Sequence, residues 1–286
     1  MPATLLPVAL GLFSAVTVAI ANVAVKRGGD VLTARMVLSI AMAISVLPFV
    51  FIVPPPPAEL WPAVLGAVMV HWFYQTCLIR SLHRGDLSLV FPVMRGLAPL
   101  FTAILAYIAL RETLSPIAVG GLVMASVALI VFALPTGSAL DRRRLDRAAL
   151  GWAVGTALGI AAYAVVDAEV ARAMPVTGTF VVWLFLLDWI GITAVTLWTR
   201  RGQILARVRP QLKAGIWGGL AGTLSYGAII YAYTLTDTTA LVTAIRETSV
   251  VFAALLGWLF LKEGFGARRS LAALALASGL VLMQLG

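Results

Sequence analysis

Two arginines lie inside apolar, helix-length stretches, where a charged side chain is costly. Arg95 is followed by the pair Arg111-Glu112, and Arg246 is followed by the pair Lys262-Glu263 at the same interval, so corresponding residues are 151 positions apart. Such an arginine pairs with another helix, reaches toward the headgroups or meets a solute. We expect Arg95 and Arg246 to occupy opposite ends of one path and to attract a substrate carboxylate.

Acidic residues form a second group that could bind a proton or a solute. Asp188 lies near the middle of an apolar stretch, where it could carry a coupling proton, contact a substrate amine or bond a neighbouring helix as a neutral acid. Asp167 and Glu169 stand closer to the end of their stretch, where water is nearer, and are weaker candidates. Glu247 directly follows Arg246, and adjacent residues cannot share a helix face, so we expect one of them to pair across helices.

Polar and aromatic residues supply the third group. His71, Tyr74 and Gln75 are three and four positions apart, so they share one helix face and are expected to line a wet cavity, although a lone buried histidine is often structural. Tyrosines favour an amphipathic organic cargo over a bare ion. A metal site is not expected, because the only other histidine, His83, falls in a loop. The predicted substrate-binding residues are His71, Tyr74, Gln75, Arg95, Tyr163, Trp183, Asp188, Tyr226 and Arg246.

The composition shows what must position these side chains. Of 286 residues, 61% are hydrophobic and only 12% are charged, whereas a soluble domain is about one quarter charged. Membrane spans need about 20 predominantly apolar residues. Ten segments qualify approximately: 5–25, 33–53, 61–80, 87–110, 115–134, 150–171, 177–199, 214–235, 239–261 and 268–285. We therefore predict an all-α integral membrane protein with ten transmembrane helices.

The basic residues predict the orientation. Seventeen of the 21 lysines and arginines fall in alternate loops and the adjacent helix ends, against Arg111 and Arg172 on the other side. This bias places the basic loops in the cytoplasm and both termini outside it, N-out and C-out. The net charge of +9 then reflects topology, and without a basic stripe interleaved with aromatics we expect no nucleic-acid partner.

Because each half contains an odd number of helices, the second half enters the membrane from the opposite side and is inverted relative to the first. We therefore expect two inverted five-helix repeats, 1–137 and 148–286, joined by a basic cytoplasmic linker at 138–147. In inverted-repeat transporters the substrate site lies at the repeat interface near the bilayer midplane. Pro92 and Pro99 interrupt the fourth span, whereas Thr243 and Val250 stand at the matched positions of the ninth, so the fourth span is expected to be kinked.

The stretches Pro92–Glu112 and Ile245–Glu263, within this ten-helix arrangement, resemble the EamA-type branch of the drug/metabolite transporter superfamily. The helix lengths and short loops are also similar to the bacterial amino-acid exporters of the YddG type. This resemblance implies a bacterial inner-membrane carrier that exports small metabolites, amino acids above all, by alternating access, with periplasmic termini. No cofactor is implied. Its expected partners are a small-molecule substrate, the lipid bilayer and a coupled proton, in a monomer or weak dimer.

A polytopic membrane enzyme and a channel are the two alternatives to a transporter. A polytopic enzyme would need catalytic residues within the membrane, and no Ser-His pair, His-Glu-x-x-His helix or paired aspartates in a recognisable setting occur. A channel usually builds its filter from rings of like residues, and the pattern contains none. A secondary transporter is the function that the sequence favours.

Overall fold

The computed structural model describes residues 5–26, 30–85, 87–134, 146–252, 255 and 266–286, and within these ranges it contains helices and no strand. Helices stand at each of the ten predicted span positions. The first half forms α1 (Leu5–Lys26), α2 (Val31–Val46), η1 (Leu47–Phe51), η2 (Ala58–Leu60), α3 (Trp61–Arg84), α4 (Leu87–Leu110) and α5 (Pro116–Ala133). The second half forms α6 (Arg147–Ala173), α7 (Thr177–Thr199), α8 (Ile204–Val208), η3 (Arg209–Gln211), α9 (Leu212–Thr234), α10 (Thr239–Glu247) and α12 (Ala267–Leu285).

The helix ends follow from capping chemistry. Asp30 caps α2 by accepting a hydrogen bond from the backbone of Thr33, Ser115 caps α5 with proline at the next position, and Asp146 caps α6. Much of the predicted linker 138–147, with its three consecutive arginines, lies outside the described residues, as do Lys262 and Glu263 of the repeated motif. The caps explain why the predicted spans end within a few residues of the helices.

Several helices are long and apolar enough to cross a membrane. Among the described residues seven segments meet this criterion: 31–51, 58–84, 90–110, 116–133, 147–173, 177–199 and 267–285. The described apolar part of α1 is shorter, and α9 carries glycines and tyrosines that lower its hydropathy. Large apolar side chains such as Met69, Ile108 and Leu274 are at least 60% exposed, as lipid contact requires and water disfavours. The chain is a multi-pass membrane protein, and the count of ten spans stays a prediction.

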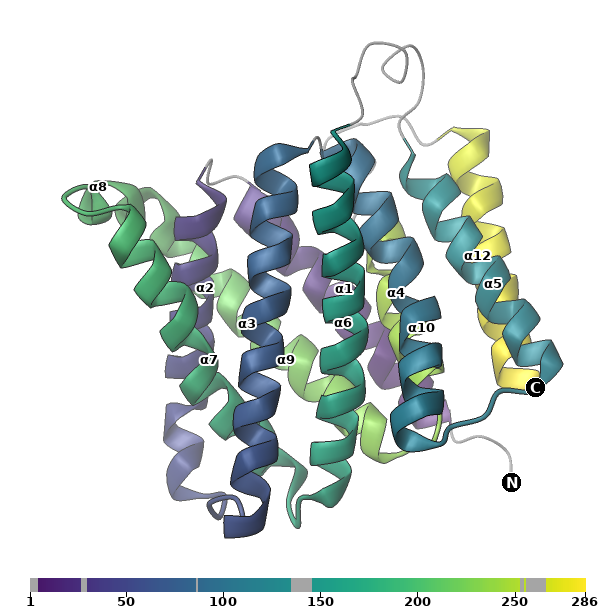
Figure 1. Ribbon diagram of the computed structural model, residues 1–286, viewed down its shortest axis with the longest axis horizontal. Coiled ribbons are helices and arrows are strands. Elements are labelled where there is room, and N and C mark those ends of the chain that lie inside the picture. Colours follow the sequence, from purple (N-terminus) through teal and green to yellow (C-terminus); the bar gives the residue numbers. More distant parts are fainter. Residues whose placement is uncertain (1–4, 27–29, 86, 135–145, 253–254, 256–265) are drawn as a thin grey trace.

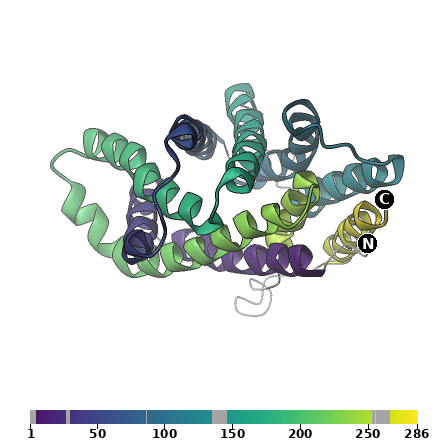
Figure 2. The same cartoon turned by 90° about the horizontal axis from the view of Figure 1, so that it is seen from below.

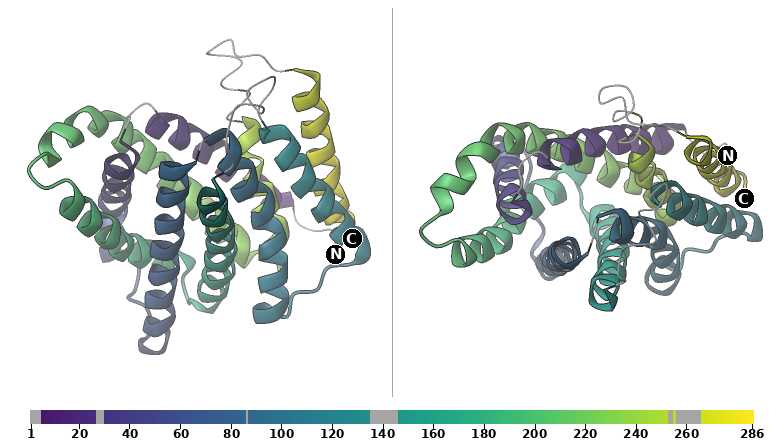
Figure 3. Two further views of the ribbon diagram at one scale, coloured as in Figure 1. Left: turned by 45° about the horizontal axis from the view of Figure 1, so that its top comes forward. Right: turned by 90° about the horizontal axis from the view of Figure 1, so that it is seen from above.

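The bundle has two layers (Figure 1). Figure 2 shows α3, α6 and α4 in one layer and α1 with α9 in the other. α1 packs along α9 and α3 packs along α6, so each of these contacts joins a helix from residues 1–137 to one from 148–286. At opposite edges, α2 packs against α7, and α5 lies beside α12 (Figure 3). The space between the layers is therefore lined by both halves.

Glycines set the closest helix contacts. A Cβ atom added to Gly121 of α5 would lie 2.5 Å from the carbonyl oxygen of Gly279 on α12, so only glycine fits. On α6, a Cβ at Gly159 would lie 2.9 Å from the Cα of Tyr74. Small residues of this kind let helix backbones approach each other in membranes. The packing of α6 on α3 brings the polar face of α3 against α6.

The fourth span and its counterpart differ in an unexpected way. α4 runs as one helix through Pro92 and Pro99, whereas α10 ends at Glu247, with Thr248 in a turn before residues 249–252 become helical again. The Thr248 hydroxyl donates to the carbonyl of Ile245 at 2.6 Å, and its backbone N–H bonds the same oxygen. This local bonding competes with the helical pattern. The interruption thus lies in the copy without prolines, directly after Arg246 and Glu247.

Candidate functional site

A buried network joins three helices at the interface of the two layers. Asp167 of α6 is fully buried, and its Oδ2 atom accepts a hydrogen bond from the Tyr226 hydroxyl of α9 at 2.5 Å. The same Oδ2 lies 3.0 Å from Nε2 of His71 on α3, which is 3.2 Å from the Tyr226 hydroxyl. His71 also stacks on Tyr163, with ring centroids 4.7 Å apart. These four side chains join α3 from the first half to α6 and α9 from the second.

The neighbouring face of α3 holds a second acid. The Gln75 amide nitrogen donates to both carboxylate oxygens of Asp188 on α7, at 2.9 and 3.0 Å. Trp72 donates its indole N–H to the Asp188 carbonyl at 2.9 Å, which ties α3 to α7 through the backbone as well. Oε1 of Gln75 is buried and has no partner among the described atoms. His71 and Gln75 therefore each meet an aspartate from the other half, and Tyr74 packs edge-on against Tyr163.

Arg95, the first of the two repeated arginines, pairs with Glu247, the residue next to the second. Arg95 of α4 donates through one NH group to both oxygens of Glu247 on α10, at 3.0 and 2.8 Å. The Glu247 side chain is 1% exposed, so this is a buried ion pair between the halves. Pairing across helices was predicted for one member of Arg246-Glu247, and this contact confirms it.

Arg246 has a different partner. Its NH1 donates to the Tyr163 hydroxyl at 3.0 Å, and its guanidinium carbon lies 5.9 Å from the ring centroids of both Tyr163 and Tyr226. Its Nε atom is buried without a hydrogen-bond partner in the described part of the chain. The prediction that Arg95 and Arg246 occupy opposite ends is therefore wrong. α4 and α10 pack together, and Arg95 is bonded to Glu247, the residue next to Arg246.

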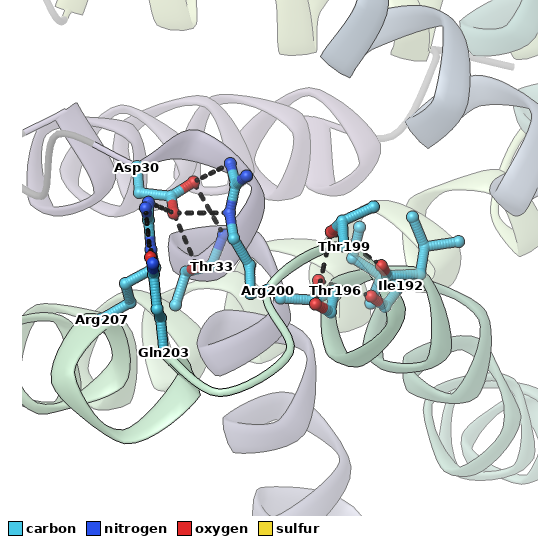
Figure 4. Close-up of polar contacts among 9 residues, drawn as sticks. Asp30, Thr33, Ile192, Thr196, Thr199, Arg200, Gln203 and Arg207 are labelled. Carbon is cyan, nitrogen blue, oxygen red and sulfur yellow. Dashed lines mark hydrogen bonds and ion pairs between the residues drawn. The ribbon is translucent and has the colours of Figure 1, made fainter.

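Two further clusters lie at opposite ends of the bundle. Figure 4 shows Asp30 at the start of α2, held by Arg200 and Arg207 from the end of α7 and from α8. Arg200 donates from Nε at 3.0 Å and Arg207 from NH1 at 2.9 Å, both to Oδ2. Burial raises the pKa of Asp30, but hydrogen bonds from Arg200, Arg207 and Thr33 outweigh it and hold that pKa well below its usual value. We call these residues the Asp30 cluster.

The Glu112 cluster lies at the other end and consists of Glu112, Arg172 and Thr239. Arg172 of α6 donates to Glu112 Oε1 at 3.0 Å, and it also donates to the carbonyls of Tyr233 and Thr236. Glu112 accepts from the backbone N–H of Thr239 at 2.7 Å, so it caps α10 from the other half of the chain. Its counterpart in the repeat, Glu263, lies outside the described residues.

Comparison with known proteins shows which fold and which family this chain is similar to. No curated protein matches the chain. A solved structure titled only "Crystal structure of protein" is similar over 96% of this chain and 95% of its own, with a TM-score of 0.71 at 14% identity, which shows a shared fold. Residues 3–134, almost the whole predicted first repeat, match the EamA-like transporter family. This match covers fewer than half of the 286 residues and shows that the first half of the chain is similar to that family.

Trp183 stands apart from the other predicted site residues. It packs edge-on against Trp61, with ring centroids 5.2 Å apart, and no contact links it to the central network among the described residues. Each of the other eight predicted residues takes part in at least one of the contacts described above. Trp183 could not be separated from them by sequence, because it lies on the same helix as Asp188 and has the same aromatic character as its neighbours.

The sequence also predicted the wrong environment for Asp167, which is buried and not close to water. It lies near the end of an apolar stretch, which suggested access to water, but the packing of α3 and α9 on α6 leaves it fully buried. Glu169, two residues on, is exposed, as expected for that end. It lines a groove of about 330 Å³ between α3 and α6, together with apolar side chains: Leu60, Ala63, Gly66, Val70, Val166, Val170 and Ala173. One helix turn thus carries one acid toward the centre and one away from it.

No group of three or more metal-ligating side chains occurs within the described ranges. The side chains at the centre can form hydrogen bonds, ion pairs and aromatic contacts, and they can exchange protons. All four are non-covalent or readily reversible, as reversible solute binding needs.

Proposed function

We propose that this protein is a secondary transporter that exports small amphipathic metabolites, aromatic or other neutral amino acids above all, by alternating access. The observation that carries the proposal is the central network, in which ionisable side chains buried among apolar helices come from both halves. Intramembrane ionisable residues are expensive and mark solute or ion pathways. The network also lies where transporters with internal repeats bind their cargo, at the interface of the halves.

The choice of cargo rests on the groups around Arg246. A carboxylate would satisfy its unpartnered Nε, and a planar fork of donors suits a carboxylate well. Tyr163 and Tyr226 offer aromatic faces beside it for an apolar side chain. Asp188 offers an acceptor for an amine. The proposed binding residues are His71, Tyr74, Gln75, Arg95, Tyr163, Asp188, Tyr226 and Arg246, while a role for Trp183 stays a prediction.

The Asp30 and Glu112 clusters suit the two gates of such a carrier. Each connects a helix of residues 1–137 to helices of 148–286, so rocking one half against the other must break one cluster while the other holds. Because basic loops favour the cytoplasmic side, we propose that the Asp30 cluster lies at the cytoplasmic face and the Glu112 cluster at the periplasmic face of a bacterial inner membrane.

The test is efflux from proteoliposomes loaded with labelled phenylalanine, leucine or aspartate. Saturable efflux of the first two, reduced at least tenfold in Arg246→Gln and markedly in His71→Ala and Tyr74→Ala, is expected. Arg201→Gln serves as the matched control, because this exposed arginine stacks on Trp198 away from the centre. Flux of inorganic ions that does not saturate would replace the proposal with a channel, and efflux that is the same in Arg246→Gln would remove Arg246 from the site.

A further inference from the structure

Asp167 and Asp188 are both central acids, but their partners differ in kind. Asp188 accepts from the Gln75 amide, a donor that cannot release its proton, and His71 on α3 and Arg35 on α2 act on it only electrostatically. Asp167 accepts from an imidazole and a phenol, and its Oδ1 has no partner among the described atoms. No side chain that donates a hydrogen bond to the Asp188 carboxylate can gain or lose a proton, whereas the Asp167 carboxylate is bonded directly to an imidazole, which can take up a second proton.

The buried geometry favours one added proton at this site. With a neutral imidazole, Nε2–H donates to Asp167 and the carboxylate charge is left uncompensated in an apolar interior, which is costly. When Nδ1 takes up a proton, the imidazolium and the carboxylate 3.0 Å away form a pair without net charge. The Tyr226 hydroxyl donates to Asp167 in both states.

The groups packed around His71 from the other helices do not remove this preference. Asp188 on α7 attracts the imidazolium and Arg246 on α10 repels it, while Tyr163 and Tyr226 are neutral phenols. The third carboxylate, Glu247, is already paired with Arg95 of α4. The charge that the proton compensates is therefore that of Asp167.

We propose that His71, Asp167 and Tyr226 bind the proton that drives transport, which assigns coupling to Asp167 in place of Asp188; this rests on the transport function proposed above. The proton enters from water on one side, forms an N–H bond at the imidazole and holds α3 against α6 and α9. It leaves to water on the other side when the halves have rocked, and no other bond forms or breaks. When the imidazolium loses this proton, the negative charge of Asp167 is no longer compensated, and the contact of α3 with α6 and α9 weakens.

The experiment measures two quantities in the same proteoliposomes. The first is exchange of labelled phenylalanine for unlabelled phenylalanine without a pH gradient, which reports binding and movement alone. The second is accumulation of labelled phenylalanine under a gradient of one pH unit, with proton flux followed by a trapped pH-sensitive dye. The variants are Asp167→Asn, His71→Gln, Asp188→Asn and, as a matched control on the same helix, Glu169→Gln, whose carboxyl faces the outer groove.

Wild-type protein and Glu169→Gln should accumulate phenylalanine several-fold under the gradient and move protons with it. Asp167→Asn should lose accumulation and proton flux while still exchanging, and His71→Gln should lose the gradient response as well, since glutamine can donate to Asp167 but cannot take up a proton. Asp188→Asn should be slower yet keep the ratio between the two measurements.

The outcomes separate the two proposals. If wild-type protein exchanges phenylalanine but ignores the pH gradient, the proton site is wrong and the transport function stands. If Asp188→Asn loses the gradient response and Asp167→Asn keeps it, the coupling acid is Asp188. If wild-type protein exchanges no amino acid at all, the proposed function fails first. Where Asp167→Asn does not stay monodisperse in detergent, the ratio of accumulation to exchange in His71→Gln decides the question, because that ratio corrects for weaker phenylalanine binding.

Discussion

The two end clusters use the same chemistry but are anchored differently. In the Asp30 cluster the carboxylate is 15% exposed and its arginines are 30% and 38% exposed, and Asp30 is held mainly by side chains. In the Glu112 cluster the carboxylate is 8% exposed, and Arg172 also donates to two backbone carbonyls. One cluster therefore borders water, whereas the other is fastened to the backbone around the end of α9 and the start of α10.

This difference implies unequal costs of opening. When the Asp30 cluster separates, its exposed arginines regain water, so little is lost. When the Glu112 cluster separates, it leaves a partly buried guanidinium, two carbonyls and the N-terminus of α10 without partners. If these are the gates of an alternating-access carrier, we expect the end with Asp30 to open more easily than the end with Glu112.

The largest effect should come from removing the acid of the tighter cluster. Glu112→Ala leaves Arg172 partly buried without its ion partner and uncaps α10, so the free energy of unfolding in detergent should fall by about 3 kcal/mol. Thermal unfolding followed by intrinsic tryptophan fluorescence measures this.

The neighbouring Arg111→Gln provides the control, because Arg111 is exposed and should change stability by less than about 0.5 kcal/mol. The comparison between the two ends would be refuted by a loss in Glu112→Ala no greater than that in Asp30→Ala.

Asp30→Ala should have an intermediate effect. The substitution removes the cap of α2 and two exposed ion pairs, which together are worth about 1–2 kcal/mol. High salt should shrink the difference from wild type at this end more than at the Glu112 end, because exposed pairs are screened. Unfolding at low and high ionic strength tests both statements.

The pH dependence of this effect has a definite sign. Since the folded-state pKa of Asp30 is depressed, its contribution is fully present above the unfolded-state pKa of about 4 and is lost as the pH falls through the folded value. The stability difference between wild type and Asp30→Ala should therefore be constant from pH 7 to about 5 and shrink below about 4. A difference that grows on acidification would contradict the assignment.

The positions of the helices were predictable because they depend on the lengths of the apolar stretches and on the residues that end them. Apolar length, proline and glycine breaks and the charge pattern located helices within a few residues, as α3 and α7 illustrate. It was also predictable that one member of Arg246-Glu247 pairs across helices, since adjacent residues cannot lie on the same helix face. These inferences need only the helix period and the cost of burying charge.

The site was predictable only in part, because burial depends on neighbouring helices. Distance from the end of a stretch suggested that Asp167 is wet, and only the packing of α3 and α9 shows that it is fully buried. Counting residues from opposite helix ends likewise separated Arg95 from Arg246, although Arg95 is bonded to Glu247, the residue next to Arg246. Arg172 was counted only as a loop charge, and nothing in the sequence connects it to Glu112.

The smallest effect offers the most direct comparison, since each cluster contains one threonine hydroxyl bonded to its acid. Thr239 donates to Glu112 at 2.6 Å and Thr33 donates to Asp30 at 2.9 Å, and both threonines are buried. Substitution by valine keeps the shape of the side chain and removes only the hydroxyl.

Hydrogen bonds to charged groups are worth about 1.5–3 kcal/mol when they are sheltered from water and less when water can replace them. Thr239→Val should therefore cost about 1.5 kcal/mol and Thr33→Val about 0.5 kcal/mol, because the arginines and water around Asp30 compensate for the lost donor. Equal losses in thermal unfolding would mean that the two ends are equally sheltered, and the expected difference in their cost of opening would disappear.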